Sequence, residues 1–209
     1  MFTQKTLAAA AALALLPLGA YAGSVEVTAG IQGNLFYDKD LNKSGDSVEG
    51  YINAAINGFY GEIWLGTLDD PIDEFEYELT LGYANDINDK LGYDASITGY
   101  YLNDSGYQNY YLTLDLIYAF SDSLSGTLEL SGDPENDTTD HSLSLEYALD
   151  KWTIVPTVGV IDGNTNYAEL EFIYTLDNGL WFEADFYDDE ASSPTIGVYI
   201  GYDFTLIGG

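Results

Sequence analysis

Apolar and polar residues alternate with a period of two over most of this chain. In the segment EFEYELTLGY, from Glu74 to Tyr83, five large apolar or aromatic side chains fall on one face of an extended strand and three glutamates fall on the other. Such a strand needs an apolar environment on one side and water on the other. Lipid outside a barrel and water inside it supply the two environments.

The same alternation recurs in further runs, which are separated by clusters of Gly, Asn, Asp, Ser and Pro. Most runs have about the length that a tilted strand needs to cross a bilayer. The pattern predicts an all-β protein, an antiparallel up-and-down transmembrane β-barrel of about 12 strands, with 10 or 14 as alternatives. The expected strands span residues 24–37, 47–56, 59–67, 73–84, 91–102, 108–120, 124–132, 141–149, 152–162, 166–176, 179–187 and 194–206.

The connections between these runs alternate in length. One set is short (57–58, 85–90, 121–123, 150–151 and 177–178), and the other is mostly longer and more acidic (38–46, 68–72, 103–107, 133–140, 163–165 and 188–193). Short periplasmic turns and longer extracellular loops are typical of outer-membrane barrels. The alternation predicts an even number of strands with both termini on the periplasmic side. Pro156 falls in the middle of a strand and predicts a bulge there.

The first residues resemble a secretory signal. Lys5 precedes an apolar stretch from Leu7 to Leu16, and Ala20-Tyr21-Ala22 forms an A-x-A cleavage site. We therefore expect residues 1–22 to be a signal peptide and residues 23–209 to form a single outer-membrane β-barrel domain of a Gram-negative bacterium. The alternative is a soluble periplasmic barrel, which would bury the apolar face and expose the acids.

Charge narrows the choice of partners. All 35 acidic residues follow residue 22, where the only basic residues are four lysines (Lys39, Lys43, Lys90 and Lys151) and Arg is absent. Nucleic acid is excluded as a partner, because phosphate binding needs clustered Lys and Arg. Cys is absent, so the fold holds together without disulfides.

Carboxylates dominate the face opposite the apolar one, and a charge facing hydrocarbon costs several kcal/mol. We expect them to line an acidic lumen that attracts cations. The expected lining residues are Glu62, Glu74, Glu76, Glu78, Asp94, Asp115, Glu129, Glu169, Glu171, Glu183 and Asp185, with Glu26, Glu146 and Asp203 on the same face. The expected partners are outer-membrane lipid and small cationic or neutral solutes, and the oligomeric state is left open.

A family resemblance supports the barrel. The segment GFYGEIWLG (Gly58 to Gly66), followed by EFEYELTLGY, resembles the proteobacterial outer-membrane family of unknown function labelled Gcw-chp. Members carry a G-F-Y-x-G-x-W-like strand followed by an acidic strand that ends in Gly-Tyr. The family's first strand usually carries an Arg-containing motif, which is missing here. The resemblance implies a barrel and supplies no function.

The first long connection has the spacing of a calcium loop. Oxygen-bearing side chains occupy positions 1, 3, 5, 7, 9 and 12 of an EF-hand-type loop, although Lys43 replaces the Gly of position 6. We expect no cofactor, with Ca²⁺ in this loop as the open alternative and a solvated Asx-rich turn as the favoured interpretation. The six candidate ligands are Asp38, Asp40, Asn42, Ser44, Asp46 and Glu49.

The sequence favours a pore over an enzyme. The single histidine, His141, is flanked by Asp140 and Ser142, which would point to the opposite face of a strand, so no catalytic triad is indicated. Bulky residues on the inner face predict a narrow or partly plugged pore. The favoured function is passive, cation-favouring passage or binding of small solutes. The alternative is a non-conducting structural or interaction barrel with acidic extracellular loops.

Overall fold

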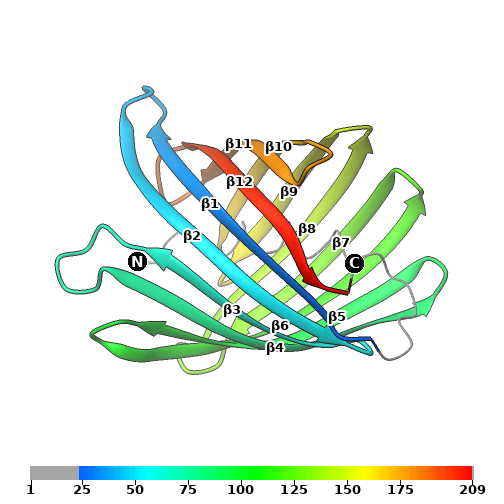
Figure 1. The fold of residues 1–209 in the computed structure, drawn as a ribbon. Helices are drawn as coiled ribbons and strands as arrows, with labels where there is room; N and C mark the ends of the chain where they lie inside the picture. Colours follow the sequence, from blue (N-terminus) through cyan, green and yellow to red (C-terminus); the bar gives the residue numbers. More distant parts are fainter. Residues whose placement is uncertain (1–23, 209) are drawn as a thin grey trace.

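The fold is a closed ring of antiparallel strands in which each strand pairs with its sequence neighbours and β1 closes the ring against β12 (Figure 1). The structure, a computed structural model, describes residues 24–208; the expected signal peptide, residues 1–22, lies outside this range. The strands are β1 (Glu26–Asp38), β2 (Lys43–Ile56), β3 (Phe59–Thr67), β4 (Phe75–Asn88), β5 (Leu91–Leu102), β6 (Gly106–Ser121), β7 (Leu124–Asp133), β8 (Thr138–Leu149), β9 (Trp152–Ile161), β10 (Thr165–Thr175), β11 (Leu180–Asp189) and β12 (Thr195–Ile207).

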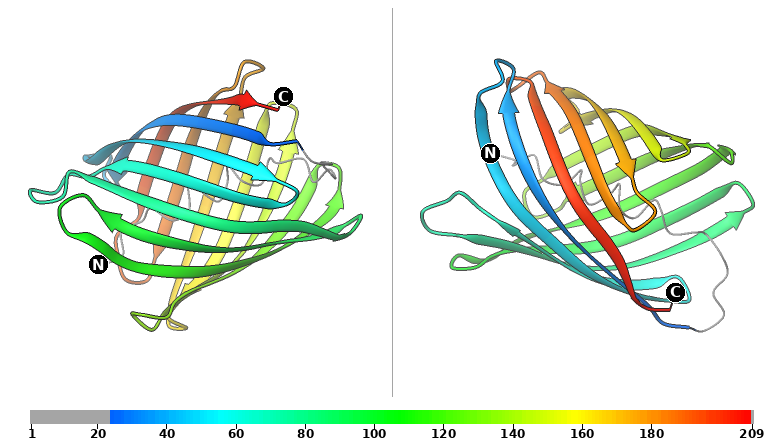
Figure 2. Two further views of the ribbon diagram at one scale, coloured as in Figure 1. Left: turned by 60° about the horizontal axis from the view of Figure 1, so that its bottom comes forward. Right: turned by 45° about the horizontal axis from the view of Figure 1, so that its top comes forward.

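The all-β, up-and-down barrel of 12 strands that the alternation predicted is therefore confirmed. The strands are strongly tilted relative to the ring, as the two views of Figure 2 show. Residues 24–208 contain no helix that is long and apolar enough to cross a membrane.

The two ends of the barrel differ as expected. Tight turns such as Asn57–Gly58 and Asp150–Lys151 join strands at the end that also holds the start of β1 and the end of β12. Gly58 and Asn57 both have positive φ, 84° and 53°, which fits a hairpin turn of the primed type. Two connections at the other end are shorter than expected, because β2 already begins at Lys43 and β8 at Thr138, whereas the connection between β3 and β4 is longer, because β4 begins only at Phe75.

The apolar face of each strand points outward. Exposed side chains such as Phe59, Ile63 and Leu81 alternate with buried or half-buried polar ones along the same strands. Aromatic pairs gather near both ends: Phe59–Tyr83 and Trp152–Tyr174 on the turn side, and Tyr77–Tyr101 on the loop side. This distribution is the aromatic girdle expected where a barrel wall meets the two lipid–water interfaces.

The bulge expected at Pro156 is absent. Pro156 pairs with Leu170 on β10 in unbroken register, and the β8–β9 register is the same before and after this position. The pairing of β9 with β8 is interrupted locally between Thr157 and Ile154 instead. Proline lacks the N–H that a ladder needs, so the strand loses pairing on one side without inserting an extra residue.

Candidate functional site: the barrel interior

Tyrosines donate hydrogen bonds to the carboxylates inside the barrel. In three rows, a tyrosine lies over a glycine of the next strand and its hydroxyl reaches an aspartate on the strand beyond. The rows are Tyr51 over Gly30 to Asp203 (3.0 Å), Tyr60 over Gly82 to Asp94 (2.8 Å) and Tyr167 over Gly159 to Asp140 (3.0 Å). Glycine is required under each ring, because an added Cβ would lie 2.2–2.4 Å from ring atoms.

Three further pairs use the same chemistry, and in one of them the ring of Tyr199 lies over Gly197 of its own strand, the cross-strand partner of Asp185. Tyr100 donates to Glu76 (2.9 Å), Tyr111 donates to Glu78, and Tyr199 donates to Asp185 (3.4 Å). Glu76 is almost completely buried, with 2% of its surface exposed. Because arginine is absent, the phenol is the main side-chain donor to these acids, and it supplies a hydrogen bond without cancelling the negative charge.

We expect Tyr60→Phe to destabilise the barrel by about 1.5–3 kcal/mol, because a half-buried carboxylate loses its donor. Unfolding by urea in detergent or lipid vesicles measures this cost. A double-mutant cycle with Asp94→Ala is the control: the cost of Tyr60→Phe should shrink when the acceptor is absent. An unchanged cost in that background would contradict a role for the Tyr60–Asp94 bond.

A second network fills the interior beside β1 and β2. Asn34 donates to Ser47 (2.8 Å) and to Glu49 (2.7 Å), Ser47 donates to Glu49 (2.8 Å), and Gln32 donates to Glu49 (3.1 Å). Asn34, Ser47 and Glu49 are all buried. Glu49 is thus held inside the barrel by neutral donors.

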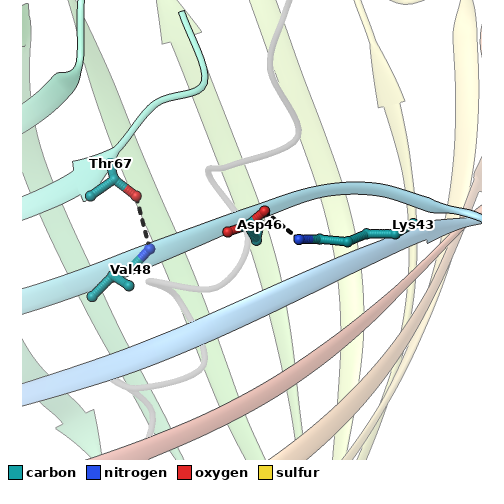
Figure 3. A network of polar contacts seen from close by, with 4 residues as sticks. All are labelled: Lys43, Asp46, Val48 and Thr67. Carbon is teal, nitrogen blue, oxygen red and sulfur yellow. Dashed lines mark hydrogen bonds and ion pairs between the residues drawn. The ribbon is translucent and has the colours of Figure 1, made fainter.

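This placement separates the six candidate calcium ligands. Strand β2 begins at Lys43, and its alternation sends Asp46 to the outer face and Glu49 to the inner one. Ser44 is the extra residue at a shift in the register between β1 and β2. Figure 3 shows Asp46 paired with Lys43 (2.6 Å), close to the Val48 N–H that donates to the Thr67 hydroxyl (2.9 Å). The EF-hand-like spacing is therefore not matched by an EF-hand-like geometry.

The remaining part of this connection forms an Asx-type turn. One carboxylate oxygen of Asp38 accepts hydrogen bonds from the N–H groups of Asp40 and Asn42, both at 2.9 Å. The side chains of Asp40 and Asn42 are exposed. Among residues 24–208, no group of three or more His, Cys, Asp or Glu side chains is arranged to hold a metal ion.

Four carboxylates share the interior face of β10 and β11. Glu169 and Glu171 lie on β10, Glu183 and Asp185 lie on β11, and Glu171 is the direct cross-strand partner of Asp185. Glu169, Glu171 and Asp185 are 5–7% exposed. Like charges that oppose each other directly across a ladder destabilise a sheet unless something neutralises them.

The other expected lining residues divide into two groups. Glu62, Asp94, Asp115 and Glu129 are half-buried on β3, β5, β6 and β7, where Asp115 pairs across the ladder with both Asp94 and Glu129. Glu74 does not belong with them. It precedes β4, which begins at Phe75, and its side chain is exposed in the connection from β3. The alternation of apolar and polar residues did not reveal that β4 starts at Phe75, one residue after Glu74.

Sequence reasoning missed the donors. Tyr51, Tyr111 and Tyr167 were not identified as interior residues, and the inner partner of each depends on which residues of neighbouring strands face each other. A tyrosine on the polar face of a strand was the signal that could have identified these donors.

His141 lies on β8 with an exposed side chain, on the opposite face from its neighbours Asp140 and Ser142.

Hydrogen bonds link the connection between β3 and β4 to the connection between β5 and β6. Buried Asp73 accepts hydrogen bonds from the N–H groups of Asp104 (2.8 Å) and Ser105 (3.0 Å) and from the Ser105 hydroxyl (2.5 Å). The Ser105 hydroxyl, followed by the N–H groups, lowers the pKa of Asp73 below its usual range.

We expect the hydrogen bonds between Asp73 and the connection from β5 to β6 to weaken in acid. A carboxyl with a lowered pKa in the folded state stabilises that state above its unfolded pKa, and the stabilisation is lost as the pH falls through the lowered value. Proteolysis of residues 68–74 by an acid-active protease should therefore accelerate below about pH 4. Asp73→Ala is the control for the protease's own pH dependence. Above about pH 4 the original protein should be cleaved more slowly than this variant, and below it the two rates should converge. A ratio of the two rates that does not change with pH would contradict a role for the Asp73 carboxylate.

Solved structures with a similar fold include porins. The KdgM porin in complex with disordered oligogalacturonate is 15% identical, with a TM-score of 0.69, and the match covers 84% of this chain and 99% of that one. A structure of the KdgM porin alone is 14% identical, with a TM-score of 0.70 and the same coverage. A mutant Rh. blastica porin is 12% identical, with a TM-score of 0.54, and the match covers 86% of this chain and all of that one. No protein-family model and no curated protein matches the sequence.

Proposed function

We propose that this chain is an outer-membrane barrel that passes or binds small cationic solutes. The supporting observation is the one-sided charge of the interior: buried and half-buried carboxylates accept hydrogen bonds from Tyr, Asn, Gln and Ser. Within residues 24–208, all four lysines lie in connections or at the start of a strand. A wall of uncompensated acids concentrates cations and repels anions.

The KdgM porin offers a contrast in chemistry on the same fold. One of its structures contains oligogalacturonate, which is a chain of uronic acids and therefore an anion. An interior lined by carboxylates would repel such a ligand. We therefore propose that this chain shares the barrel fold with the KdgM porin and prefers solutes of the opposite charge to oligogalacturonate.

The outer-membrane location follows from the exposed apolar wall and its aromatic girdles, which suit lipid contact. The signal peptide at residues 1–22, the single barrel domain at 23–209 and the relation to the Gcw-chp family are parts of the same proposal. Extraction of bacterial membranes tests it. Release of the chain without detergent would contradict an integral outer-membrane protein and would favour the periplasmic alternative.

Recording in planar bilayers tests the cation preference. The purified protein is inserted into a neutral bilayer that separates two KCl concentrations, and the reversal potential is measured. We expect stepwise increases in conductance as single channels insert, and a reversal potential whose sign shows that K⁺ permeates better than Cl⁻. A conducting protein whose reversal potential shows a preference for Cl⁻ would overturn the proposal.

A non-conducting structural or interaction barrel is the second candidate. Four inner tyrosines favour it, because Tyr60, Tyr167, Tyr187 and Tyr199 are each less than 10% exposed and occupy space inside the ring. The same bilayer recording separates the two candidates. Insertion of folded protein without any conductance would favour this second candidate.

A further inference from the structure

The acids on β10 and β11 differ from most others in the interior. We call Glu169, Glu171, Glu183 and Asp185 the β10–β11 acidic cluster. Alternation along each strand puts all four on the inner face, and the ladder opposes Glu171 directly to Asp185. Side chains two residues apart on one strand are separated by about 7 Å. The cluster is therefore an elongated patch of four carboxylates on two paired strands.

One member of the cluster is buried without a hydrogen-bond partner. Glu169, Glu171 and Asp185 are more than nine-tenths buried, at 7%, 5% and 7% exposure. Glu169 and Asp185 share a hydrogen bond between their carboxyl groups, whereas Oε2 of Glu171, directly opposite Asp185, has no hydrogen-bond partner among the described residues. A buried carboxylate without a donor is costly, and opposed charges add to the cost. The unpartnered oxygen of Glu171 points to a ligand that donates hydrogen bonds and carries positive charge.

Aromatic rings frame the cluster. Tyr187 is the cross-strand partner of Glu169 and stacks on Tyr167 with ring centroids 5.7 Å apart, and Tyr199 is the partner of Glu183. The rings are themselves buried. Organic ammonium groups bind well between carboxylates and aromatic faces, because the negative face of the ring attracts the cation.

The geometry favours an organic cation over a metal ion. A metal needs several oxygens at 2.0–2.6 Å around one point, and these side chains are not arranged in that way. An aliphatic amine donates from separate ammonium groups along a flexible chain, which matches acids spread over two strands. A carboxyl pair that shares a hydrogen bond holds one proton, so Glu169 and Asp185 carry one negative charge together with one each on Glu171 and Glu183. A ligand with two or more positive charges suits this balance.

We propose that the β10–β11 acidic cluster is a binding site for an aliphatic di- or polyamine. One ammonium group donates to the unpartnered oxygen of Glu171 and another to the Glu169–Asp185 pair, while its carbon chain lies against the tyrosines. This inference rests on the proposed cation-binding function and gives it a ligand class and a place on the barrel wall.

Titration calorimetry with spermidine tests the site. The barrel domain, folded in detergent, is compared with the double variant Glu171→Gln/Asp185→Asn and with the matched control Asp94→Asn/Asp115→Asn. The control removes another directly opposed pair of interior acids, on β5 and β6, and changes the net charge equally. Asp115 also has an oxygen without a hydrogen-bond partner, but both control residues are only half-buried. Mobility of unheated samples on SDS gels verifies folding, which both variants should retain because they remove like-charge repulsion.

We expect the cluster variant to weaken spermidine binding by about tenfold or more and the control to change it by less than about threefold, in line with the strength of charged hydrogen bonds. Equal losses in the two variants would overturn the site in favour of general charge attraction. Mg²⁺ that binds as tightly as spermidine and is lost in the same variant would overturn the ligand class.

Bilayer recording on the same preparations distinguishes this inference from the proposed function. K⁺ passage without spermidine binding would overturn the site and leave cation passage in place. Spermidine binding without conductance would support the site and overturn passage.

Discussion

Gly82→Val is expected to destabilise the barrel by about 3–5 kcal/mol or to prevent it from folding. A Cβ at this position would lie 2.2 Å from Cζ of Tyr60, so the ring must leave its place and its hydroxyl must release Asp94. The estimate adds the cost of overpacking to that of a lost hydrogen bond to a charged group. Refolding into lipid vesicles, followed by urea unfolding, measures the change.

Gly33→Val is the matched control for this substitution. Gly33 lies on the outer face of β1 in a shallow groove lined by Val48 and Ile200, and no atom lies within 4 Å of an added Cβ. The added side chain would face lipid, so we expect a change of less than about 1 kcal/mol. Equal destabilisation by the two substitutions would show that valine disrupts any glycine position in this wall, and that the Tyr60 contact has no special role.

The double substitution Glu62→Lys/Glu129→Lys is expected to reduce the permeability ratio of K⁺ to Cl⁻ by about tenfold. A change of this size is within the range by which a lining of one charge sign raises the local concentration of counter-ions. Both glutamates are half-buried on the inner wall, and neither accepts a tyrosine hydrogen bond in the described structure. The substitutions therefore change the interior charge without removing the acceptor of a Tyr–carboxylate pair. Reversal potentials in a KCl gradient measure the preference.

Asp69→Lys/Glu74→Lys provides the control with the same change in net charge. Both residues are exposed in the connection between β3 and β4, so water and salt screen their effect on the interior. We expect a much smaller change in ion preference. A shift as large as that of the interior variant would mean that selectivity is set at the mouth of the barrel.

The fold was predictable from the sequence because a barrel wall is a repeated local pattern. Side chains alternate strictly along a strand, so the run from Phe75 to Tyr83 reveals its lipid-facing side without knowledge of its neighbours. Turn residues such as Asn57-Gly58 mark where one strand ends and the next begins. Strand ends were less accurate, and for this reason Glu74 was wrongly placed on the wall.

The polar contacts of the interior were not predictable. The Asp38–Glu49 spacing suggested a calcium loop, but β2 starts inside that segment and turns Glu49 inward to Asn34 and Ser47. The bulge expected at Pro156 was wrong, since the strand loses local pairing instead of shifting its register. Both features depend on how neighbouring strands align.

The sequence by itself determined a two-faced, twelve-stranded barrel with acids on the polar side, because alternation is a property of one strand at a time. The tertiary structure decided which side chains meet. Tyr60 reaches Asp94 only because the registers of β3 with β4 and of β4 with β5 place Gly82 between them. Glu171 opposes Asp185 only because β10 pairs with β11 in one alignment. Register depends on all strands together, so no single segment of the sequence encodes it.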